Sequence, residues 1–235
     1  MIEFQRVGKR YANGNQALAE VSFTVQRSEM AFITGPSGAG KSTVLRLIAL
    51  IERPSHGQIL INGRSLASIR RRQIPGFRRQ IGVIFQDHKL LVERPVFDNV
   101  ALPLVIAGIP AAEIPRRVGA ALDLVGLGGK EQARPLALST GEQQRVGIAR
   151  AVISRPPILI ADEPTGNLDP ELSFEIMHLF QRLNQVGITV LVASHDHELI
   201  RRLGNRYLSL RAGRMVAPEL YDGNQTTAGN SHAGT

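Results

Sequence analysis

The chain has 235 residues, of which 43% are hydrophobic and 20% are charged, and it contains no cysteine. This composition excludes wholesale disorder, and the lack of cysteine excludes disulfides, thiolate metal sites and a cysteine nucleophile. The net charge of +8 favours an anionic partner such as a nucleotide, a nucleic acid or an acidic membrane surface, although a solvated basic surface explains it equally well.

The N-terminal part shows no targeting or membrane segment. Residues 1–11 carry Glu3 and no apolar run, which is not the pattern of a signal peptide. Residues 99–112 form the longest uncharged stretch and are too short to span a bilayer. We therefore expect the protein to be made and kept in the cytoplasm, where it could still bind a membrane protein.

Strands and helices alternate along the chain. Val21, Phe23 and Val25 alternate with polar residues, as in a half-buried antiparallel strand. Apolar runs predict buried strands at 30–33, 81–85, 158–161 and 189–193, the last two in a parallel sheet. Helical spacing predicts three core-facing helices, marked by Val44, Leu45, Ile48 and Ile51, then by Ile114, Val118, Ala121, Leu122 and Val125, and then by Leu172, Ile176, Leu179, Phe180 and Leu183.

This order of elements predicts an α/β fold with a mostly parallel sheet and an N-terminal antiparallel β part. Residues 98–137 look mostly helical and interrupt the alternation, which indicates an inserted helical subdomain at about 87–155. The core would then comprise about 1–86 and 156–216. Residues 217–235 are polar, small and glycine-rich, so we expect a flexible tail without chemistry.

A phosphate-binding loop is the first functional motif. Residues 35–42 match GxxxxGK[ST], lie between a predicted strand and a predicted helix, and allow several backbone N–H groups to converge on phosphate oxygens. Lys41 would reach the β- and γ-phosphates, and Ser42 would bind Mg²⁺. A flexible glycine turn is the alternative explanation. The candidate nucleotide-binding residues here are Gly35, Pro36, Ser37, Gly38, Ala39, Gly40, Lys41, Ser42 and Thr43.

Two acids follow the predicted strand 158–161. Because ligands bind at the carboxyl ends of parallel strands, Asp162 is placed to hold Mg²⁺ through water, and Glu163 to accept a proton from an attacking water. The alternative is an acidic pair that caps a helix before Pro164.

A third motif lies earlier in the chain. Ser139 and Glu142 have capping-box spacing, so a helix should begin there. Its N–H groups could hold phosphate, although an ordinary helix start explains this pair in isolation.

In combination these motifs resemble the nucleotide-binding subunits of ABC transporters. Residues 35–42 resemble Walker A, 160–163 end a Walker B strand, 138–144 resemble the LSGGQ signature, and 166–169 resemble the D-loop. Gln86 and His195 stand where the family has its Q-loop glutamine and switch histidine. The motifs occur in family order over residues 1–216, which implies a single ABC ATP-binding domain with a P-loop NTPase core.

The resemblance implies roles for these residues. Two copies would form an ATP-dependent homodimer, with each ATP between the phosphate loop of one and Ser139, Gly141 and Glu142 of the other. Mg²⁺ would bind Ser42, Gln86 and Asp162, and the catalytic residues would be Glu163, His195 and Gln86. Tyr11 would stack on adenine, unless it only packs, and Asp169 would link the two sites. His195, Asp196 and His197 could instead suggest a metal site, but no third ligand group follows at a recognised spacing.

The stretch from Asp87 to Gly108 resembles the cell-division members of the family more closely. That resemblance implies a transmembrane partner subunit, a peripheral place on the cytoplasmic face of the inner membrane, and control of peptidoglycan hydrolases. The lipoprotein-release and macrolide-export members remain the alternative.

Thr140 replaces the first signature glycine, and a β-branched residue is disfavoured there if the backbone needs a positive φ.

Three further interpretations concern what the chain binds and whether it hydrolyses nucleotide. Docking of a membrane subunit near Gln86 is suggested by the apolar residues that follow it: Leu90, Leu91, Val96 and Phe97. The arginines at 70–72 and 78–79 could contact an anionic membrane surface or nucleic acid, but the short interval between Ser42 and Ser139 leaves no room for the long arms of chromosome-maintenance relatives, so we expect no specific nucleic acid. A nucleotide-binding scaffold without hydrolysis is disfavoured by Glu163 and His195.

Overall fold

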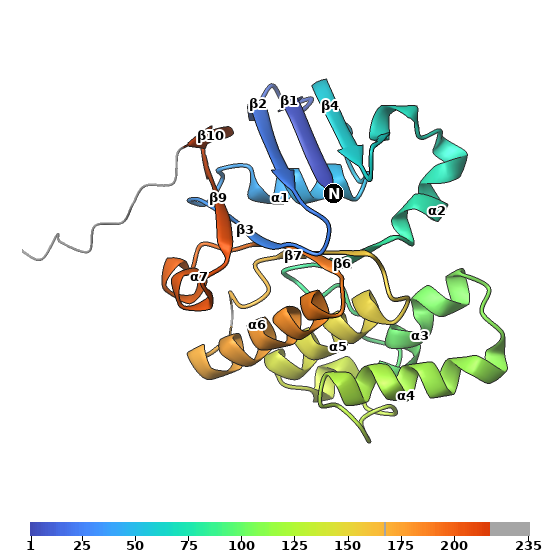
Figure 1. Ribbon diagram of the computed structural model, residues 1–235. Helices are drawn as coiled ribbons and strands as arrows, with labels where there is room; N and C mark the ends of the chain where they lie inside the picture. The colour runs from blue at the N-terminus through green and yellow to red at the C-terminus, as the bar shows by residue number, and fades with distance from the viewer. Residues whose placement is uncertain (167, 217–235) are drawn as a thin grey trace, which may run out of the picture.

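The computed structural model describes residues 1–166 and 168–216, and the predicted tail at 217–235 lies outside the described residues. Two sheets organise the chain (Figure 1). The first is antiparallel, with strand order β2-β1-β4-β5. Its strands are β1 (Ile2–Arg10), β2 (Gln16–Val25), β4 (His56–Ile61) and β5 (Arg64–Ser65).

The second sheet has six strands in the order β10-β9-β3-β8-β7-β6. All neighbours in it are parallel except the antiparallel pair β9 and β10. Its strands are β3 (Met30–Thr34), β6 (Ile81–Ile84), β7 (Ile158–Asp162), β8 (Thr189–Ala193), β9 (Arg206–Arg211) and β10 (Arg214–Val216). The predicted α/β fold with a mostly parallel sheet and an N-terminal antiparallel part is confirmed.

Helices cover both faces of the parallel sheet. Helix α1 lies between the two sheets, whereas α5 and α6 lie on the opposite side of the parallel sheet, with α3 and α4 beside them (Figure 1). The α-helices are α1 (Lys41–Ile48), α2 (Ile74–Arg78), α3 (Val96–Ile106), α4 (Ile114–Leu124), α5 (Thr140–Val152), α6 (Pro170–Gln185) and α7 (His197–Leu203). Short 3₁₀ turns occupy Leu66–Ser68, Arg71–Gln73, Ala111–Glu113 and Pro135–Ala137.

The parallel sheet separates two apolar cores. Phe32 of β3 and Leu159 of β7 belong to the core shared with α3–α6, whereas their neighbours Ile33 and Ile160 belong to the core shared with α1 and the antiparallel sheet. Successive side chains of a strand point to opposite faces, so a strand buried on both faces needs an uninterrupted apolar run. This explains why these strands could be predicted as short apolar runs.

Helix α1 is shorter than predicted. It ends at Ile48, and Leu50 then adopts a left-handed backbone with φ 51°. The N–H of Ile51 donates to the carbonyl of Arg46 at 2.9 Å, which closes the helix end and turns the chain outward. Ile51 is therefore 45% exposed, and its predicted place on the core face of this helix is wrong.

The segment between β6 and β7 holds α3, α4 and α5. The predicted face of α4 is buried at Val118, Ala121 and Leu122, and Asp169 caps α6. Val96, however, is fully buried at the start of α3 and cannot serve as a docking residue, whereas Leu91 is 45% exposed. Within residues 1–166 and 168–216, no helix has both the length and the apolar character needed to cross a bilayer.

Candidate functional site

The phosphate loop connects β3 to α1 through backbone conformations that require glycine. Gly35 has φ 147°, and a Cβ there would lie 2.1 Å from the carbonyl oxygen of Leu210 in β9. Gly40 has φ 109° and would bring a Cβ within 2.7 Å of the Ala17 carbonyl oxygen. The loop is therefore wedged between β9 and β2, which fixes its curvature at the N-terminus of α1, where helix N–H groups favour an anion.

Lys41 points back into this loop. It is only 7% exposed, and its Nζ donates to the carbonyl of Gly35 at 2.7 Å and to that of Pro36 at 3.3 Å. The same Nζ lies 3.3 Å from Oε1 of Glu163, whose side chain is 12% exposed. A cation buried to this degree needs such partners, and its position allows it to face phosphate oxygens bound in the loop.

The carboxylate of Glu163 contacts both Lys41 of the phosphate loop and His195. Its Oε2 lies 2.8 Å from Nδ1 of His195, whose side chain is 66% exposed. The structure thus brings together Lys41, Glu163 and His195, which lie far apart in the sequence. Glu163 also has a left-handed backbone with φ 46°, held by its N–H, which donates to the carbonyl of Ala193 at 2.9 Å. Such strain in a non-glycine residue is typical of functional positions.

Asp162 lies at the end of β7 beside the first turn of α1. The hydroxyl of Ser42 donates to its Oδ1 at 3.0 Å. Burial raises the pKa of the Asp162 carboxyl, and the neighbouring Glu163 charge acts in the same direction, while the Ser42 hydrogen bond opposes the shift. A cation at this position would relieve the cost of burying the carboxylate.

The donor set around Asp162 fits magnesium. Mg²⁺ prefers hard oxygen ligands and is held in phosphate-binding enzymes by one or two protein oxygens together with the phosphates. Ser42 and Asp162 supply two such oxygens that already face each other, and the exposed Gln86 follows β6, which is paired with β7. The alternative metal site at residues 195–197 is a different arrangement. Within the described part of the chain, no group of three or more histidine, aspartate or glutamate side chains is placed to hold a metal ion, and Asp196 caps α7.

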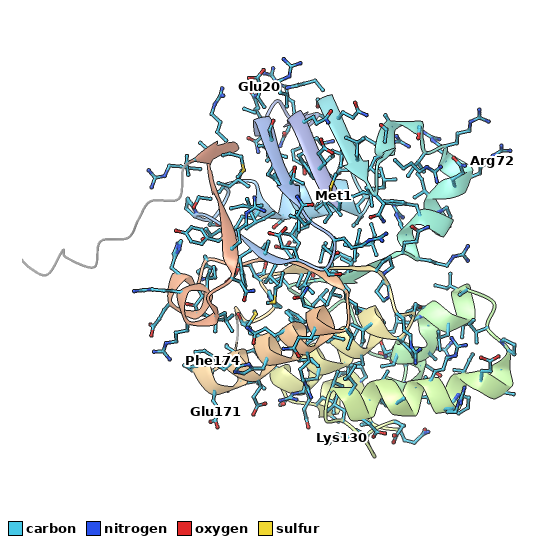
Figure 2. All side chains as sticks on the ribbon, viewed as in Figure 1. Met1, Glu20, Arg72, Lys130, Glu171 and Phe174 are labelled. Atoms are coloured by element: carbon cyan, nitrogen blue, oxygen red, sulfur yellow. The ribbon has the colours of Figure 1, made fainter. Side chains whose placement is uncertain are left out.

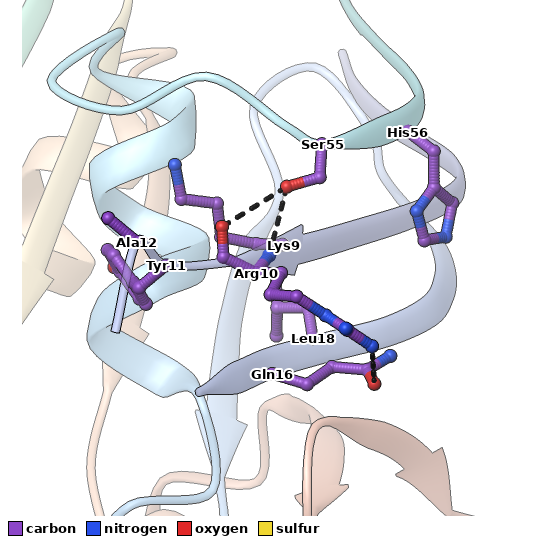
Figure 3. Close-up of a pocket in the computed structure, with 8 residues that line it drawn as sticks. All are labelled: Lys9, Arg10, Tyr11, Ala12, Gln16, Leu18, Ser55 and His56. Atoms are coloured by element: carbon purple, nitrogen blue, oxygen red, sulfur yellow. Dashed lines mark hydrogen bonds between the residues drawn. The ribbon is translucent and has the colours of Figure 1, made fainter. Parts of the chain in front are cut away.

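Tyr11 lies beside the same helix. Its hydroxyl is 3.3 Å from Oγ1 of Thr43 in the first turn of α1, and Nζ of Lys9 lies 5.0 Å from the centre of its ring. Tyr11 also lines a pocket of about 480 Å³ (Figure 3). The other residues that line it are Lys9, Arg10, Ala12, Gln16, Leu18, Ser55 and His56. An aromatic ring thus lies next to the phosphate loop, as stacking on adenine would require.

The signature segment forms the start of α5, as its capping-box spacing predicted. The N–H of Glu142 donates to Oγ of Ser139 at 3.3 Å, and the N–H of Ser139 donates to Oε2 of Glu142 at 3.0 Å. Hydrogen bonds from Lys130 and from the Ser139 backbone lower the pKa of Glu142. Thr140 is the first helical residue and is not among the residues of positive φ, so a β-branched side chain fits this backbone.

The signature segment packs on α6 rather than on the phosphate loop. A Cβ on Gly141 would lie 2.2 Å from Cδ2 of Leu172, in the first turn of α6. Asp169 is occupied in capping that helix, where it accepts from the N–H of Leu172 at 2.9 Å. The predicted residues therefore form two groups, one at the phosphate loop and one at the start of α5 and α6.

Two residues that sequence patterns did not single out hold the loop after Gln86. Arg150 of α5 donates to the carbonyls of His88 and Lys89, which both have left-handed backbones. Asn99 of α3 is fully buried and bonds the N–H and carbonyl of Leu91 at 2.7 and 3.0 Å. The signal for Arg150 was its position four residues after Val146 on the buried face of α5, where an arginine needs partners.

Comparison with known sequences places the chain in a family. The family model described as ABC transporter matches residues 18–166. The cell division ATP-binding protein FtsE of Escherichia coli (strain K12) is 56% identical over 215 residues, which cover 92% of this chain and 97% of that protein. FtsE of Bacillus subtilis (strain 168) is 46% identical over 219 residues, which cover 93% and 96%. The predicted resemblance to the cell-division members is confirmed.

Solved structures agree with this placement. A bacterial ABC transporter cassette in dimeric form has a TM-score of 0.86 and 34% identity, and the match covers 92% of this chain and 97% of the cassette. The same cassette in a dimeric post-hydrolysis state bound to ADP and Pi has a TM-score of 0.85. The chain therefore belongs to the ABC transporter family and is one of its ATPases.

Proposed function

We propose that this ATPase acts as an ATP-dependent homodimer on the cytoplasmic face of the inner membrane, where it drives an FtsX-like membrane subunit that controls peptidoglycan hydrolases during cell division. The observation that carries the hydrolytic part is the contact of Glu163 with both Lys41 and His195, at 3.3 and 2.8 Å. The identity to FtsE proteins supports the cell-division part. The dimeric forms of the similar cassette support the homodimer.

Each residue at the phosphate loop has a defined task in this proposal. The loop and the N-terminus of α1 bind the phosphates, and Lys41 exchanges its contact with Glu163 for the γ-phosphate. Glu163 is thereby released to accept a proton from the attacking water, while His195 and Gln86 hold the γ-phosphate and the water in position. Ser42, Asp162 and Gln86 would hold a magnesium ion, which would supply positive charge near the phosphate oxygens.

The second group of residues completes the site of the partner subunit. Ser139, Gly141 and the N–H groups at the start of α5 contact the γ-phosphate bound by the other copy, and Asp169 links the two sites. ATP therefore favours the closed pair, and hydrolysis removes the phosphate that bridges the two surfaces. Because the chain acts through another protein, this opening and closing moves the membrane subunit.

The exchange of Glu163 for glutamine tests the hydrolytic part. Glu163→Gln keeps the shape of the side chain but removes the proton acceptor, so ATP turnover should fall by about 10²-fold or more. The variant should also accumulate as an ATP-bound dimer in size-exclusion chromatography with light scattering. Glu20→Gln, an exposed acid in β2 away from both groups of site residues, is the matched control and should keep wild-type turnover. Wild-type turnover of Glu163→Gln would exclude Glu163 as the base.

The membrane partner is tested with the same variant. Tagged Glu163→Gln, expressed in the native host and stabilised with ATP, should co-purify with an FtsX-like membrane protein. Recovery of a lipoprotein-release or macrolide-export permease instead would leave the ATPase chemistry intact and overturn the cell-division assignment.

A further inference from the structure

One continuous segment carries almost all of the net positive charge of the chain. Residues 53–86 contain seven arginines and no lysine, aspartate or glutamate, so they account for seven of the eight net positive charges. All seven arginines are exposed. Two of them, Arg53 and Arg78, donate side-chain hydrogen bonds to backbone carbonyls. We call the other five the arginine segment: Arg64, Arg70, Arg71, Arg72 and Arg79.

The other two arginines attach this region to the body of the protein. Arg53 donates to the carbonyls of Leu66 and Ile69, the second at 2.7 Å. Arg78 donates to the carbonyl of Leu50, just after α1, at 2.8 Å. These contacts hold the turn Leu66–Ser68 and helix α2 in place, so the arginine segment is displayed on a folded surface rather than on a free loop.

The charges of the arginine segment are not neutralised by the protein. Among the ion pairs of the described residues, none includes a member of this segment. Arg72 points away from the body of the molecule (Figure 2). The segment therefore presents a group of free guanidinium ions, which form paired hydrogen bonds with phosphate oxygens.

The chemistry of this surface selects against nucleic acid. The helical elements between Arg64 and Arg79 are two 3₁₀ turns of three residues each and α2 of five residues, all too short to enter a groove as a recognition helix. Phe77, the aromatic residue of α2, is 7% exposed and cannot stack on a base. A positively charged surface that has no element to read a groove or stack on a base suits the phosphate headgroups of a membrane surface.

We propose that the arginine segment binds the anionic phospholipid headgroups of the bilayer in which the membrane partner resides, an inference that rests on the membrane association proposed above. The segment leads directly into β6, the edge strand that ends just before Gln86, and α2 and α3 lie on the same side of the molecule (Figure 1). The lipid contact thus adjoins the loop after Gln86. It gives the ATPase a second attachment, which raises its effective concentration at the membrane subunit.

Vesicle binding tests the lipid contact on the isolated full chain. In sedimentation with protein-free vesicles, the chain should bind mixtures of phosphatidylglycerol and phosphatidylcholine, and binding should fall as salt is added. The triple variant Arg70→Gln, Arg71→Gln, Arg72→Gln should bind about 100-fold more weakly, since each arginine near such a surface contributes about fivefold. The matched control Arg116→Gln, Arg134→Gln, Arg201→Gln removes the same charge from exposed positions elsewhere and should bind nearly as well as the wild type.

Each alternative result overturns the lipid contact. Equal binding to pure phosphatidylcholine vesicles, or an equal loss in the control variant, would show that the segment has no specific role. Tighter binding to duplex DNA than to vesicles at the same salt concentration, lost in the arginine variant, would identify nucleic acid as the partner. The triple variant should keep wild-type ATP turnover, and Glu163→Gln should keep vesicle binding. A failure of the ATPase mechanism is therefore separable from a failure of the lipid contact.

Discussion

The phosphate-loop region and the signature region of this chain are stabilised by different kinds of contact. Around the phosphate loop, groups from β3, α1, β7 and β8 meet: Lys41 contacts Glu163, and Ser42 contacts Asp162, across 122 and 120 positions of sequence. At the start of α5, Ser139 and Glu142 bond each other within three residues. One region depends on the whole sheet, whereas the other is a local helix cap.

This difference has a consequence for how the two regions respond to change. The phosphate loop is packed between β9 and β2, so a change of one backbone position there should disturb the fold as well as the site. The signature cap is exposed and self-contained, so its loss should cost little stability while still removing its surface for a partner. Three changes test this contrast, and the expected effect on stability decreases from the first to the last.

Gly35→Ala should have the largest effect. The new Cβ would lie 2.1 Å from the Leu210 carbonyl oxygen, at a φ of 147°, so both overpacking and backbone strain oppose it. We expect a loss of about 3–5 kcal/mol in the free energy of unfolding and no detectable nucleotide binding. Denaturant unfolding of the nucleotide-free protein measures the first quantity, and fluorescent ATP titration the second.

The matched control for this change is Gly38→Ala. Gly38 also has a positive φ, 76°, but no atom lies within 4 Å of the added Cβ. Backbone strain alone should cost about 1–2 kcal/mol. Equal destabilisation by the two substitutions would mean that the contact with β9 is not what restricts Gly35.

Ser139→Ala should have an intermediate effect on stability. It removes the side-chain acceptor for the Glu142 N–H, and loss of such a cap costs about 1 kcal/mol. Binding of ADP to the monomer should remain at the wild-type level, because this cap has no contact with the phosphate loop, whereas the ATP-dependent dimer should be lost. Thermal unfolding and isothermal titration check these two results. Weaker ADP binding by the monomer would show that the two regions are coupled within one chain.

Asp162→Asn should have the smallest effect, and it should be stabilising. Burial raises the pKa of Asp162 in the folded state, so the folded protein binds its proton more tightly than the unfolded chain does. The contribution of Asp162 to stability is therefore greatest at low pH and decreases as the pH rises toward the raised pKa. At neutral pH the asparagine should raise the free energy of unfolding slightly, by less than the Ser139 cap contributes, in the absence of nucleotide and magnesium.

The pH dependence separates charge from shape. The advantage of Asp162→Asn over the wild type should disappear in acid, where the wild-type carboxyl is already protonated. Glu142→Gln is the control of opposite sign, because the pKa of Glu142 is lowered. Its charge stabilises the fold at neutral pH, and that stability is lost as the pH falls through the lowered pKa. Melting temperatures recorded across acid and neutral pH would contradict this account if both variants shifted in the same direction.

Local patterns predicted most of what positions the site. Strands β3, β6, β7 and β8 are short apolar runs, and the capping box depends on residues within three positions, so neither pattern needs knowledge of tertiary structure. The parallel strand β9 is not an apolar run, since it begins and ends with exposed arginines, and it was not predicted. The strand β1 was not predicted, because Arg6 has a left-handed φ of 44° and the pairing shifts register between Phe4 and Val7. Such a bulge breaks the alternation that identifies a strand.

What could not be predicted depends on contacts between distant elements. The end of α1 follows from the backbone of Leu50, which is an unusual conformation for a leucine. The burial of Val96 depends on the arrangement of α3 against its neighbours, so its apolar character looked equally suitable for docking. The partners of Arg150 are carbonyls of a loop about 60 residues earlier in the chain, so its position on the buried face of α5 shows that it needs partners but not which ones. Asn99 bonds Leu91, only eight residues earlier, but through a loop conformation that the sequence pattern does not reveal.

The loop after Gln86 has a mechanical property that follows from these two residues. Arg150 ties the carbonyls of His88 and Lys89 to α5, and Asn99 ties Leu91 to α3, so the loop is braced at both ends. A braced loop transmits a displacement instead of absorbing it. The first turn of α5 carries the signature segment. A shift of α5 should therefore move the residues after Gln86 with it, because the hydrogen bonds leave the loop little freedom to deform.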